Sequence, residues 1–573
     1  MTEATAGDDP GQPPVPEALV ARARTERWAE RLFERDTSLW SSDPEVQATI
    51  AQRLGWLDAP THFHGEIGPL EAFGEAMRDA GFTTAIVGGM GGSSLAPEVL
   101  QKTFGSGEDW LELRVLDSTD PAAVGAVVDD RYPLETLFVV ATKSGTTAEP
   151  LAFQADAWAR IEAAIQERHL HKMSPGDFMV AITDPDRSLD AIPHHDAFRE
   201  VFLNPPDIGG RYAALSYVGL VPASLIGLDL DPFLASARSM LDRCHAKHPE
   251  ANPGVSLGLF LGSNALAGRD KLTFVADPEI ASFGSWAEQL IAESTGKHGV
   301  GIVPVDLEPL GGVDAYGPDR VFVRLTVADS AGPAPAADGT AAADLLTALE
   351  AVGHPVVRIA LADPIDLAGE FVRWEVATAI AGIVLGIDPF DQPNVEEAKE
   401  GTRHALAAID GAGRADGPPG DAPVRADDPG LAATLRTQLD RLASNGYVCL
   451  QAYVAPSAER DAALSRIRAI ARDRTRRATT AGYGPRFLHS TGQLHKGGPP
   501  IGWFLQLTAD HPVDRPIPGK PYTFGQLIDA QAAGDLAVLR AHDLPVLRIH
   551  LGSDPDAGLA ALERALAAAL KES

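Results

Sequence analysis

An amide, a carboxylate and an ammonium group recur at four-residue intervals in one short segment, at Gln289, Glu293 and Lys297. In a helix, side chains four residues apart lie on the same face. A carboxylate held beside a cation and an amide can remove a proton from a carbon that neighbours a carbonyl group. The alternative is an exposed Glu–Lys pair, which stabilises a helix by only about 0.2–0.5 kcal/mol. The chemical interpretation therefore depends on other polar clusters that suit the same reaction.

Two further segments have the composition of phosphate-binding loops. Residues 88–97 are rich in glycine and serine, follow a short apolar run and lead into a helical pattern. Glycine lets backbone N–H groups close around an anion at a helix N-terminus. Residues 142–149 follow another apolar run and contain hydroxyls and a lysine. A dinucleotide-binding loop and an ordinary Ser/Thr-capped turn are the alternatives, but two such loops at the ends of neighbouring strands favour one phosphate cup.

Three more segments supply polar groups of the kinds that such a site needs. Arg211 follows two glycines and precedes an apolar helical run, which favours a position in a cleft over the surface. In residues 388–399, Gln392 and Lys399 lie two turns apart on one helix face if the helix begins near Pro393. His489 lies in a glycine-containing loop and can exchange protons near neutral pH. A solvated loop histidine is the alternative, and the surrounding residues do not form a metal-binding pattern.

Short apolar runs alternate with amphipathic stretches in a way that predicts the elements holding these groups. The pattern predicts strands at 83–87, 113–116, 137–141 and 178–182, with helices at 95–104, 122–129 and 150–166 between them. A second set comprises strands at 271–276, 321–327 and 355–361 and a helix at 286–294. Strands separated by helices pair in parallel. The predicted fold class is therefore α/β, with two doubly wound parallel-sheet domains, a helical N-terminal cap and a rearranged C-terminal segment.

Composition shifts suggest where these parts begin and end. The predicted divisions are a tail and helical cap (1–60), a first α/β domain (61–245), a second that carries Glu293 (246–410), a linker (411–430) and a C-terminal α/β segment with the histidine loop (431–573). Residues 344–361 resemble residues 535–551, and we favour the duplication of a helix–strand unit over chance similarity in Ala- and Leu-rich sequence.

Charge and composition restrict the partners. The chain has 573 residues and a net charge of −31, so anionic nucleic acid and lipid surfaces would be repelled, and an anionic ligand requires a local positive pocket. The two cysteines, Cys244 and Cys449, indicate a reducing compartment and are expected to be buried. The N-terminal residues lack the pattern of a secretory signal, and no apolar run approaches the length of a membrane helix. We expect a cytoplasmic protein.

Taken together, these clusters resemble the glucose-6-phosphate isomerase family, which is built from two sugar-isomerase (SIS) domains. The resemblance covers about 83–399 and a further piece near His489, and it is most specific at 286–297 and 388–396. The arrangement is most similar to the isomerase half of bacterial transaldolase/isomerase fusions, although no transaldolase segment is evident. The resemblance implies reversible isomerisation of glucose 6-phosphate and fructose 6-phosphate, without metal or cofactor.

Carried over position by position, the resemblance implies a role for each matching residue. Glu293 would be the base that moves a proton between C1 and C2, Arg211 would stabilise the enediolate, and His489 and Lys399 would assist ring opening. Gln289 and Gln392 would hold sugar hydroxyls. The 6-phosphate would be bound by Gly92, Ser93, Thr142, Lys143, Ser144 and Thr147.

Two departures from the family pattern stand out. Ala213 replaces a serine that usually follows the Gly-Gly-Arg-Tyr motif. The histidine loop, which in the family lies between the base and lysine segments and enters the neighbouring subunit's site, here follows Lys399. The family arrangement implies a homodimer. Two other functions stay open, a non-catalytic SIS-type sugar-phosphate sensor and an isomerase of mannose 6-phosphate or an amino-sugar phosphate.

Overall fold

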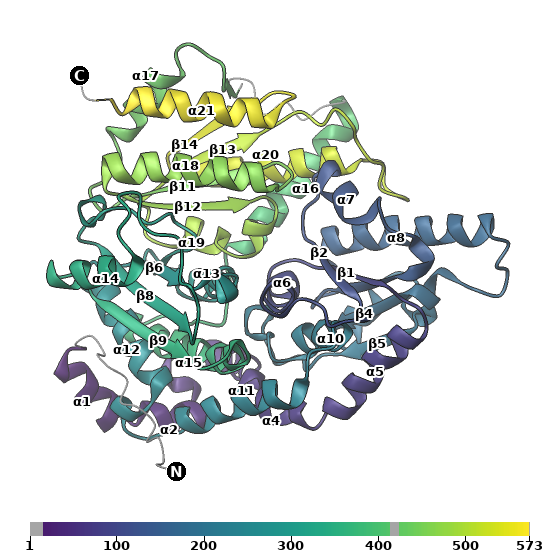
Figure 1. Ribbon diagram of the computed structural model, residues 1–573, viewed down its shortest axis with the longest axis horizontal. Helices are drawn as coiled ribbons and strands as arrows, with labels where there is room; N and C mark the ends of the chain where they lie inside the picture. Colours follow the sequence, from purple (N-terminus) through teal and green to yellow (C-terminus); the bar gives the residue numbers. More distant parts are fainter. Residues whose placement is uncertain (1–14, 413–422, 572–573) are drawn as a thin grey trace.

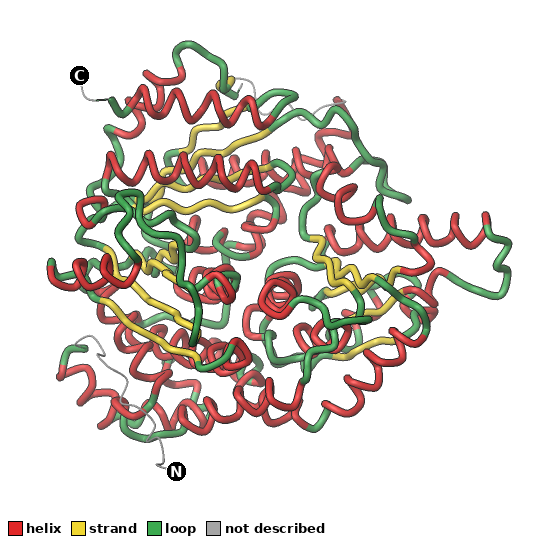
Figure 2. Tube along the Cα trace, viewed as in Figure 1, coloured by secondary structure: helices red, strands yellow, loops and turns green. Residues whose placement is uncertain are grey.

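Three parallel β-sheets, each covered by helices, are found in residues 15–412 and 423–571, the part of the chain described by this computed structural model (Figures 1 and 2). In Figure 1 the first sheet lies at the right, the second at the lower left and the third at the top. The α/β fold class predicted from the sequence is confirmed. The predicted tail and the middle of the predicted linker lie outside the described residues.

The first sheet has the strand order β2-β1-β3-β4-β5. Its central strands consist largely of buried apolar residues, as expected for a parallel sheet covered on both faces. The strands are β1 (Thr84–Gly88), β2 (Glu112–Leu116), β3 (Thr136–Ala141), β4 (Met179–Thr183) and β5 (Glu200–Leu203). The helices between them are α6 (Gly92–Phe104), α7 (Pro121–Val128), α8 (Ala148–Glu167) and α9 (Arg187–Asp190).

The second sheet has the order β7-β6-β8-β9 and is also parallel throughout. Its strands are β6 (Lys271–Ala276), β7 (Val303–Val305), β8 (Arg320–Val327) and β9 (Val356–Leu361). Its helices are α13 (Phe283–Thr295), α14 (Ala342–Ala351) and α15 (Leu367–Leu385). α13 lies beside α6 of the first sheet near the middle of the molecule (Figure 1).

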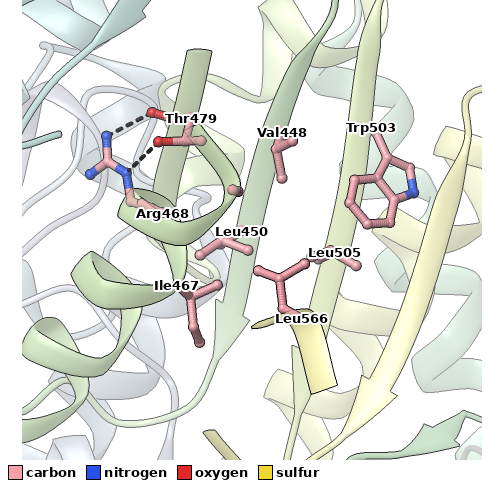
Figure 3. Close-up of a pocket in the computed structure, with 9 residues that line it drawn as sticks. Val448, Leu450, Ile467, Arg468, Thr479, Trp503, Leu505 and Leu566 are labelled. Carbon is pink, nitrogen blue, oxygen red and sulfur yellow. Dashed lines mark hydrogen bonds between the residues drawn. The ribbon is translucent and has the colours of Figure 1, made fainter. Parts of the chain in front are cut away.

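The predicted C-terminal segment forms a third sheet, in the order β10-β14-β13-β11-β12. Its strands are β10 (Val424–Arg425), β11 (Tyr447–Tyr453), β12 (Ala478–Tyr483), β13 (Gly502–Thr508) and β14 (Val546–His550). Its helices are α17 (Leu431–Leu439), α18 (Ala458–Thr475), α19 (Gly492–Gly497), α20 (Phe524–Ala541) and α21 (Pro555–Ala569). Figure 3 shows apolar side chains of β11, β13, α18 and α21 meeting on one face of this sheet. Because β10 pairs with β14, the predicted linker includes an edge strand.

All three sheets share one topology once the edge strands β5 and β10 are set aside. In each, the first strand lies between the second and third strands, and the fourth strand follows the third. The two similar sequence stretches occupy equivalent places, since each contains the fourth strand, β9 or β14, and part of the helix that precedes it. This equivalence supports the interpretation that a helix–strand unit was duplicated.

The remaining helices form the N-terminal cap, a layer against the first two sheets, and α16 (Val395–Ala412), which packs against α20 of the third sheet. The predicted helical cap is confirmed, as α1 (Glu17–Thr25), α2 (Trp28–Phe33) and α3 (Pro44–Ala51). The others are α4 (Ala59–His64), α5 (Ile67–Asp79), α10 (Tyr217–Leu225), α11 (Leu230–Cys244) and α12 (Pro253–Leu266). Both cysteines are free and buried, as expected. Among the described residues, no helix combines the length and apolar character needed to cross a membrane.

A buried ionic network joins the second sheet to the third. Glu308, which follows β7, lies 2.8 Å from Arg320 Nη2 of β8, and it accepts hydrogen bonds of 2.8 Å from the backbone N–H and 2.7 Å from the hydroxyl of Thr479 in β12. Arg468 of α18 donates to the carbonyl oxygen of Thr479 and to that of Asp306. Burial alone would raise the pKa of Glu308, but the charges of Arg320 and Arg468 lower it. The network fixes the third sheet against the second.

We expect Glu308→Ala to lower the free energy of unfolding by about 3–5 kcal/mol, because it leaves the buried Arg320 guanidinium without a counter-charge. Urea unfolding measures this directly. In the wild type, the stabilisation is present above pH 4.5, the ordinary pKa of the group, and is lost as the pH falls through the lower folded-state pKa. Glu350→Ala, which breaks an exposed pair with Arg358, is the control and should cost about 1 kcal/mol or less. Equal losses in both variants would contradict the prediction.

Candidate active site

A cavity of about 380 Å³ lies where the three sheets and the N-terminal cap meet. Every site residue predicted from the sequence lines it except Lys399. The polar residues that line the cavity are Arg53, Ser93, Thr142, Lys143, Ser144, Thr147, Asp184, Ser188, Arg211, Gln289, Glu293, Gln392 and His489. Gly92 also lines the cavity, at the first turn of α6.

The glycine-rich loop after β1 lets three parts of the chain approach one another. A Cβ atom at Gly91 would lie 2.7 Å from the carbonyl oxygen of His489, and one at Gly92 would lie 1.9 Å from that of Gly210. Gly91 also has a φ of +57°, which favours glycine. The N-terminus of α6 therefore opens onto the cavity with Gly92 and Ser93, and its free N–H groups give that end a partial positive charge.

The loop after β3 forms the second wall of the predicted phosphate cup. Thr142, Ser144 and Thr147 line the cavity, and Thr147 immediately precedes α8, so a second helix N-terminus faces the same space. The Thr142 hydroxyl is buried and has no hydrogen-bond partner among the described residues. A buried polar atom in that state is explained by a ligand or an ordered water at the site.

Two cations face this wall. Lys143 Nζ lies 2.6 Å from Asp184 Oδ2, so Asp184 offsets its charge, and burial raises the pKa of Asp184 despite that lysine. Arg53, which lies just after α3 of the cap, also lines the cavity. The cup thus holds one more positive charge than the sequence alone predicted.

On the opposite side, α13 presents Glu293 and Gln289 to the cavity. Glu293 is 8% exposed, its Oε1 lies 3.1 Å from Arg211 Nη1, and its Oε2 accepts a hydrogen bond of 3.0 Å from Gln289 Nε2. The expected combination of carboxylate, cation and amide is present. The cation is Arg211, however, because α13 ends at Thr295 and Lys297 lies beyond it. The expectation that Lys297 shares the helix face of Glu293 is wrong.

Lys297 instead supports the turn that carries Gln392. Its ammonium group donates to the backbone carbonyls of Asp388 and Asp391, and burial, followed by the charge of Arg211, lowers its pKa to about 8. Arg211 donates through Nη2 to the carbonyls of Pro389 (2.7 Å) and Asp391 (2.9 Å). Two cations therefore hold one turn in place.

All five N–H groups of Arg211 face acceptors of the protein itself. Nε–H donates to Ser294 Oγ at 2.7 Å, Nη2 donates to two carbonyls, and Nη1 faces Gln392 Oε1 at 3.0 Å and Glu293 Oε1 at 3.1 Å. The guanidinium is consequently fixed by its far edge, the one formed by Nε and Nη2. Only its Nη1 edge, shared with two cavity side chains, can turn to a bound molecule.

His489 reaches the cavity from the third sheet of the same chain, after β12. Its Nε2 lies 3.1 Å from Glu149 Oε1 of α8, and its backbone carbonyl accepts a hydrogen bond of 2.9 Å from Gln289 Nε2. Burial would raise the pKa of Glu149, but the charges of His489 and Lys399 lower it overall. The chain thus supplies its own histidine, so the reason that the resemblance gave for a homodimer does not apply.

Lys399 is the one predicted site residue that the structure does not bring into the cavity wall. It lies on α16 with its side chain 45% exposed, and its Nζ is 3.3 Å from Glu396 Oε2. Its charge nevertheless acts on Glu149 across the end of the cavity.

Sequence reasoning missed several residues of the cavity. Asp184 and Ser188 follow β4, and the argument that ligands lie at the carboxyl ends of parallel strands could have found them. Glu149 ends the segment 142–149 that the sequence singled out; it does not line the cavity itself but contacts His489 from α8. Nothing in the sequence predicted that Arg53 lines the cavity, since it is one of many charged residues in a helical cap.

The fold and the cavity define a class of protein, an α/β protein that holds anion-binding groups and a buried carboxylate–arginine pair in one cavity. Comparisons with known proteins narrow this class. The phosphoglucose isomerase family model matches residues 70–308. The glucose-6-phosphate isomerase of Rubrobacter xylanophilus is 30% identical over 370 residues, which are 57% of this chain and 83% of that protein. That of Citrifermentans bemidjiense is 26% identical over 405 residues, 63% of this chain and 73% of that protein.

A solved structure has a similar fold. A hypothetical protein of Thermus thermophilus has a TM-score of 0.56 and 25% identity to this chain, over 69% of this chain and 97% of its own. The chain belongs to the phosphoglucose isomerase family. The family model ends before the third sheet begins, so the histidine and the helices of that sheet lie outside the matched residues.

Proposed function

We propose that this protein interconverts glucose 6-phosphate and fructose 6-phosphate by proton transfer through an enediolate. Its family membership supports this activity. The observation that carries it is the position of Glu293: a buried carboxylate, 3.1 Å from the Arg211 guanidinium, lies in the same cavity as a loop-built cup for an anion. A carboxylate so placed can act as base while the adjacent cation meets the charge that forms on oxygen.

In the proposed reaction, the phosphate occupies the cup formed by the loops after β1 and β3. Glu293 takes the proton from C2 of the open aldose, the electron pair of that bond forms the C1–C2 double bond, and O1 becomes an oxyanion. The proton of the O2 hydroxyl passes to O1, and Glu293 gives its proton to C1 as the carbonyl group forms at C2. Arg211 is held rigidly by its far edge, so its Nη1 edge is ready for the oxyanion, in exchange for a contact with Gln392 or Glu293.

The two glutamines suit the remaining hydroxyls. Gln289 Oε1 is buried and without a hydrogen-bond partner in the described part of the chain, so it is available to accept from a sugar hydroxyl. Gln392 Oε1 accepts from Arg211 Nη1, which leaves its amide nitrogen to donate. Both groups lie within the same cavity as Glu293.

His489 and Glu149 are proposed to open the sugar ring. With Nε2 engaged by the Glu149 carboxylate, Nδ1 is the ring nitrogen left to exchange a proton with the ring oxygen or the anomeric hydroxyl. Lys399 would act on this pair through its charge, from outside the cavity wall.

A coupled assay tests the proposal directly. The purified protein is supplied with fructose 6-phosphate and glucose 6-phosphate is detected, beside parallel assays with mannose 6-phosphate and an amino-sugar phosphate, each with and without a chelator. We expect turnover of fructose 6-phosphate that the chelator does not change. Binding without turnover of any sugar would favour the sensor, and preference for another sugar would favour the alternative isomerases. Loss of activity with chelator would overturn the metal-free mechanism.

The phosphate cup makes a prediction about binding. We expect Lys143→Ala and Arg53→Ala each to raise KM for fructose 6-phosphate by about 10–100-fold with a smaller change in kcat, because a charge-assisted bond of about 1.5–3 kcal/mol is lost in ground and transition states alike. Lys143→Ala should have the larger effect, since it also leaves the Asp184 carboxylate uncompensated beside the phosphate. Steady-state kinetics of both variants measures this.

The matched control is Lys172→Ala, which removes an exposed lysine from the turn after α8. It should leave KM unchanged and so correct for the general change in net charge. An unchanged KM in Lys143→Ala would refute its proposed role. A homodimer and a cytoplasmic location stay predictions, to be tested by sedimentation and by fractionation.

A further inference from the structure

Gln531, on α20 of the third sheet, lies behind the pair formed by Glu149 and His489. It is 2% exposed, its Nε2 donates to Glu149 Oε1 at 2.7 Å, and its Oε1 accepts from the Thr119 hydroxyl at 2.6 Å. Thr119 follows β2 of the first sheet and is fully buried. A chain of hydrogen bonds thus runs from Thr119 through Gln531 and Glu149 to His489.

The direction of the chain is set by the Glu149 carboxylate, which only accepts hydrogen bonds when it is ionised. Because that carboxylate accepts from Gln531 Nε2, the amide directs its Oε1 at Thr119, whose hydroxyl donates to it. The same carboxylate oxygen, Oε1, then accepts from both Gln531 and His489. With two donors on one oxygen, the Glu149 carboxylate is held in one position, from which Oε1 accepts the hydrogen bond of the His489 imidazole.

Burying these polar groups costs free energy unless each of them has a hydrogen-bond partner. Transfer of an amide from water into a protein interior costs free energy when its hydrogen bonds are not replaced. Here one hydrogen bond at each end of the Gln531 amide is directed at a group of the first sheet, although the residue belongs to the third. The partner that gains from this is Glu149, because a donor to a carboxylate favours its ionised form.

In the described part of the chain, other titratable groups interact electrostatically with Glu149. They include His489 and Lys399, whose charges act on it, and Tyr522, whose pKa is raised by burial and by Glu149. The hydrogen bond of His489 therefore requires that Glu149 be ionised and correctly placed. Gln531 is the neutral donor that favours the ionised form and holds the carboxylate in that position.

We infer that Gln531, held by Thr119, is a positioning residue for the His489–Glu149 pair and so for the acid–base step that opens the sugar ring. This inference rests on the proposed function. It gives the third sheet a second contribution to the site besides the histidine itself. Gln531 acts through Glu149 and is not among the residues that line the cavity.

The test compares Gln531→Met, Thr119→Val and Thr119→Ser with the wild type in the coupled assay between pH 5 and 9. Met keeps the length of the side chain without the amide, Val keeps the shape of Thr without the hydroxyl, and Ser keeps the hydroxyl. We expect Gln531→Met to lower kcat about tenfold, with KM unchanged, as one bond to a charged group is lost.

The pH profile separates this role from a merely structural one. Without the Gln531 donor, the protonated form of Glu149 is favoured, so its pKa rises and the acidic limb of the kcat profile moves up by about one pH unit. Thr119→Val should shift the limb in the same direction, and Thr119→Ser should superimpose on the wild type. Thermal unfolding and protection by inorganic phosphate establish that each variant is folded with an intact cup.

The outcomes are distinct. A wild-type protein without isomerase activity refutes the proposed function and this inference with it. An active wild type whose limb stays in place in both Gln531→Met and Thr119→Val overturns the inference alone. If Thr119→Ser is as defective as Thr119→Val, the hydroxyl does not hold the amide in place, and the inference fails likewise. If Gln531→Met does not fold, the two Thr119 variants decide.

Discussion

Glu293→Gln should lose nearly all isomerase turnover while its affinity for fructose 6-phosphate stays close to that of the wild type. The amide keeps the size of the side chain and its place 3.1 Å from Arg211, but it cannot take a proton from carbon. A general base typically contributes about 10²–10⁴-fold to a rate, and this cavity has no second carboxylate on the same wall, among its described residues, to replace it. We expect kcat to fall by at least that factor.

The measurement pairs steady-state kinetics with direct binding by calorimetry, because KM alone does not report affinity when turnover changes. Glu288→Gln is the matched control. Glu288 precedes Gln289 on α13 but lines a separate cavity of about 360 Å³, and burial, followed by the charge of Asp306, raises its pKa to about 8. At neutral pH it is already mostly uncharged, so the substitution should change turnover little. Turnover near the wild-type level in Glu293→Gln would refute the assignment of the base.

Arg211→Lys should lower kcat by about 10²–10³-fold, the usual cost of losing a well-placed donor at a developing oxyanion. Lysine keeps the positive charge. It cannot reproduce a planar fork that is fixed through Nε and Nη2 to Ser294, Pro389 and Asp391 while Nη1 faces the cavity. The variant therefore tests whether the positive charge alone is sufficient or whether the geometry of the guanidinium is also needed. The fall in kcat with fructose 6-phosphate measures the contribution of that geometry.

Arg324→Lys controls for the general cost of shortening a buried arginine. Arg324, in β8, also makes several buried hydrogen bonds, to two backbone carbonyls and to Asp277, but it does not line the cavity. We expect it to lose stability with kcat unchanged. If Arg211→Lys retains wild-type kcat, or if both variants lose kcat equally, the proposed role of the Arg211 fork is wrong.

The first two sheets could be predicted from the sequence to within one or two residues per strand, except for β5 and β7. Their strands are mostly runs of buried apolar residues between helical stretches, so a pattern of hydrophobicity is enough to locate them. β5 and β7 are short and were missed. The third sheet was predicted only as an α/β segment, because Gln451 and Gln506 lie fully buried in the middle of β11 and β13 and interrupt the apolar pattern.

The cavity could be predicted where a polar cluster directly follows a strand, as at Thr142 and Lys143, since parallel strands bring their carboxyl ends to one edge. It could not be predicted where the contact depends on how separate units pack. Arg53 comes from the cap, and the bond between Thr119 and Gln531 joins residues 412 positions apart. Lys297 shows the converse error, because a helix that ends at Thr295 turns this side chain away from the face that spacing suggested.

The origin of the His489 loop has a consequence for any assembly that this protein forms. All the reacting groups proposed above, from the cup to the imidazole, belong to one polypeptide. Dilution or exchange of subunits would leave each copy with a full set of reacting groups. The specific activity is therefore expected to stay constant when the protein is diluted to a concentration at which copies separate.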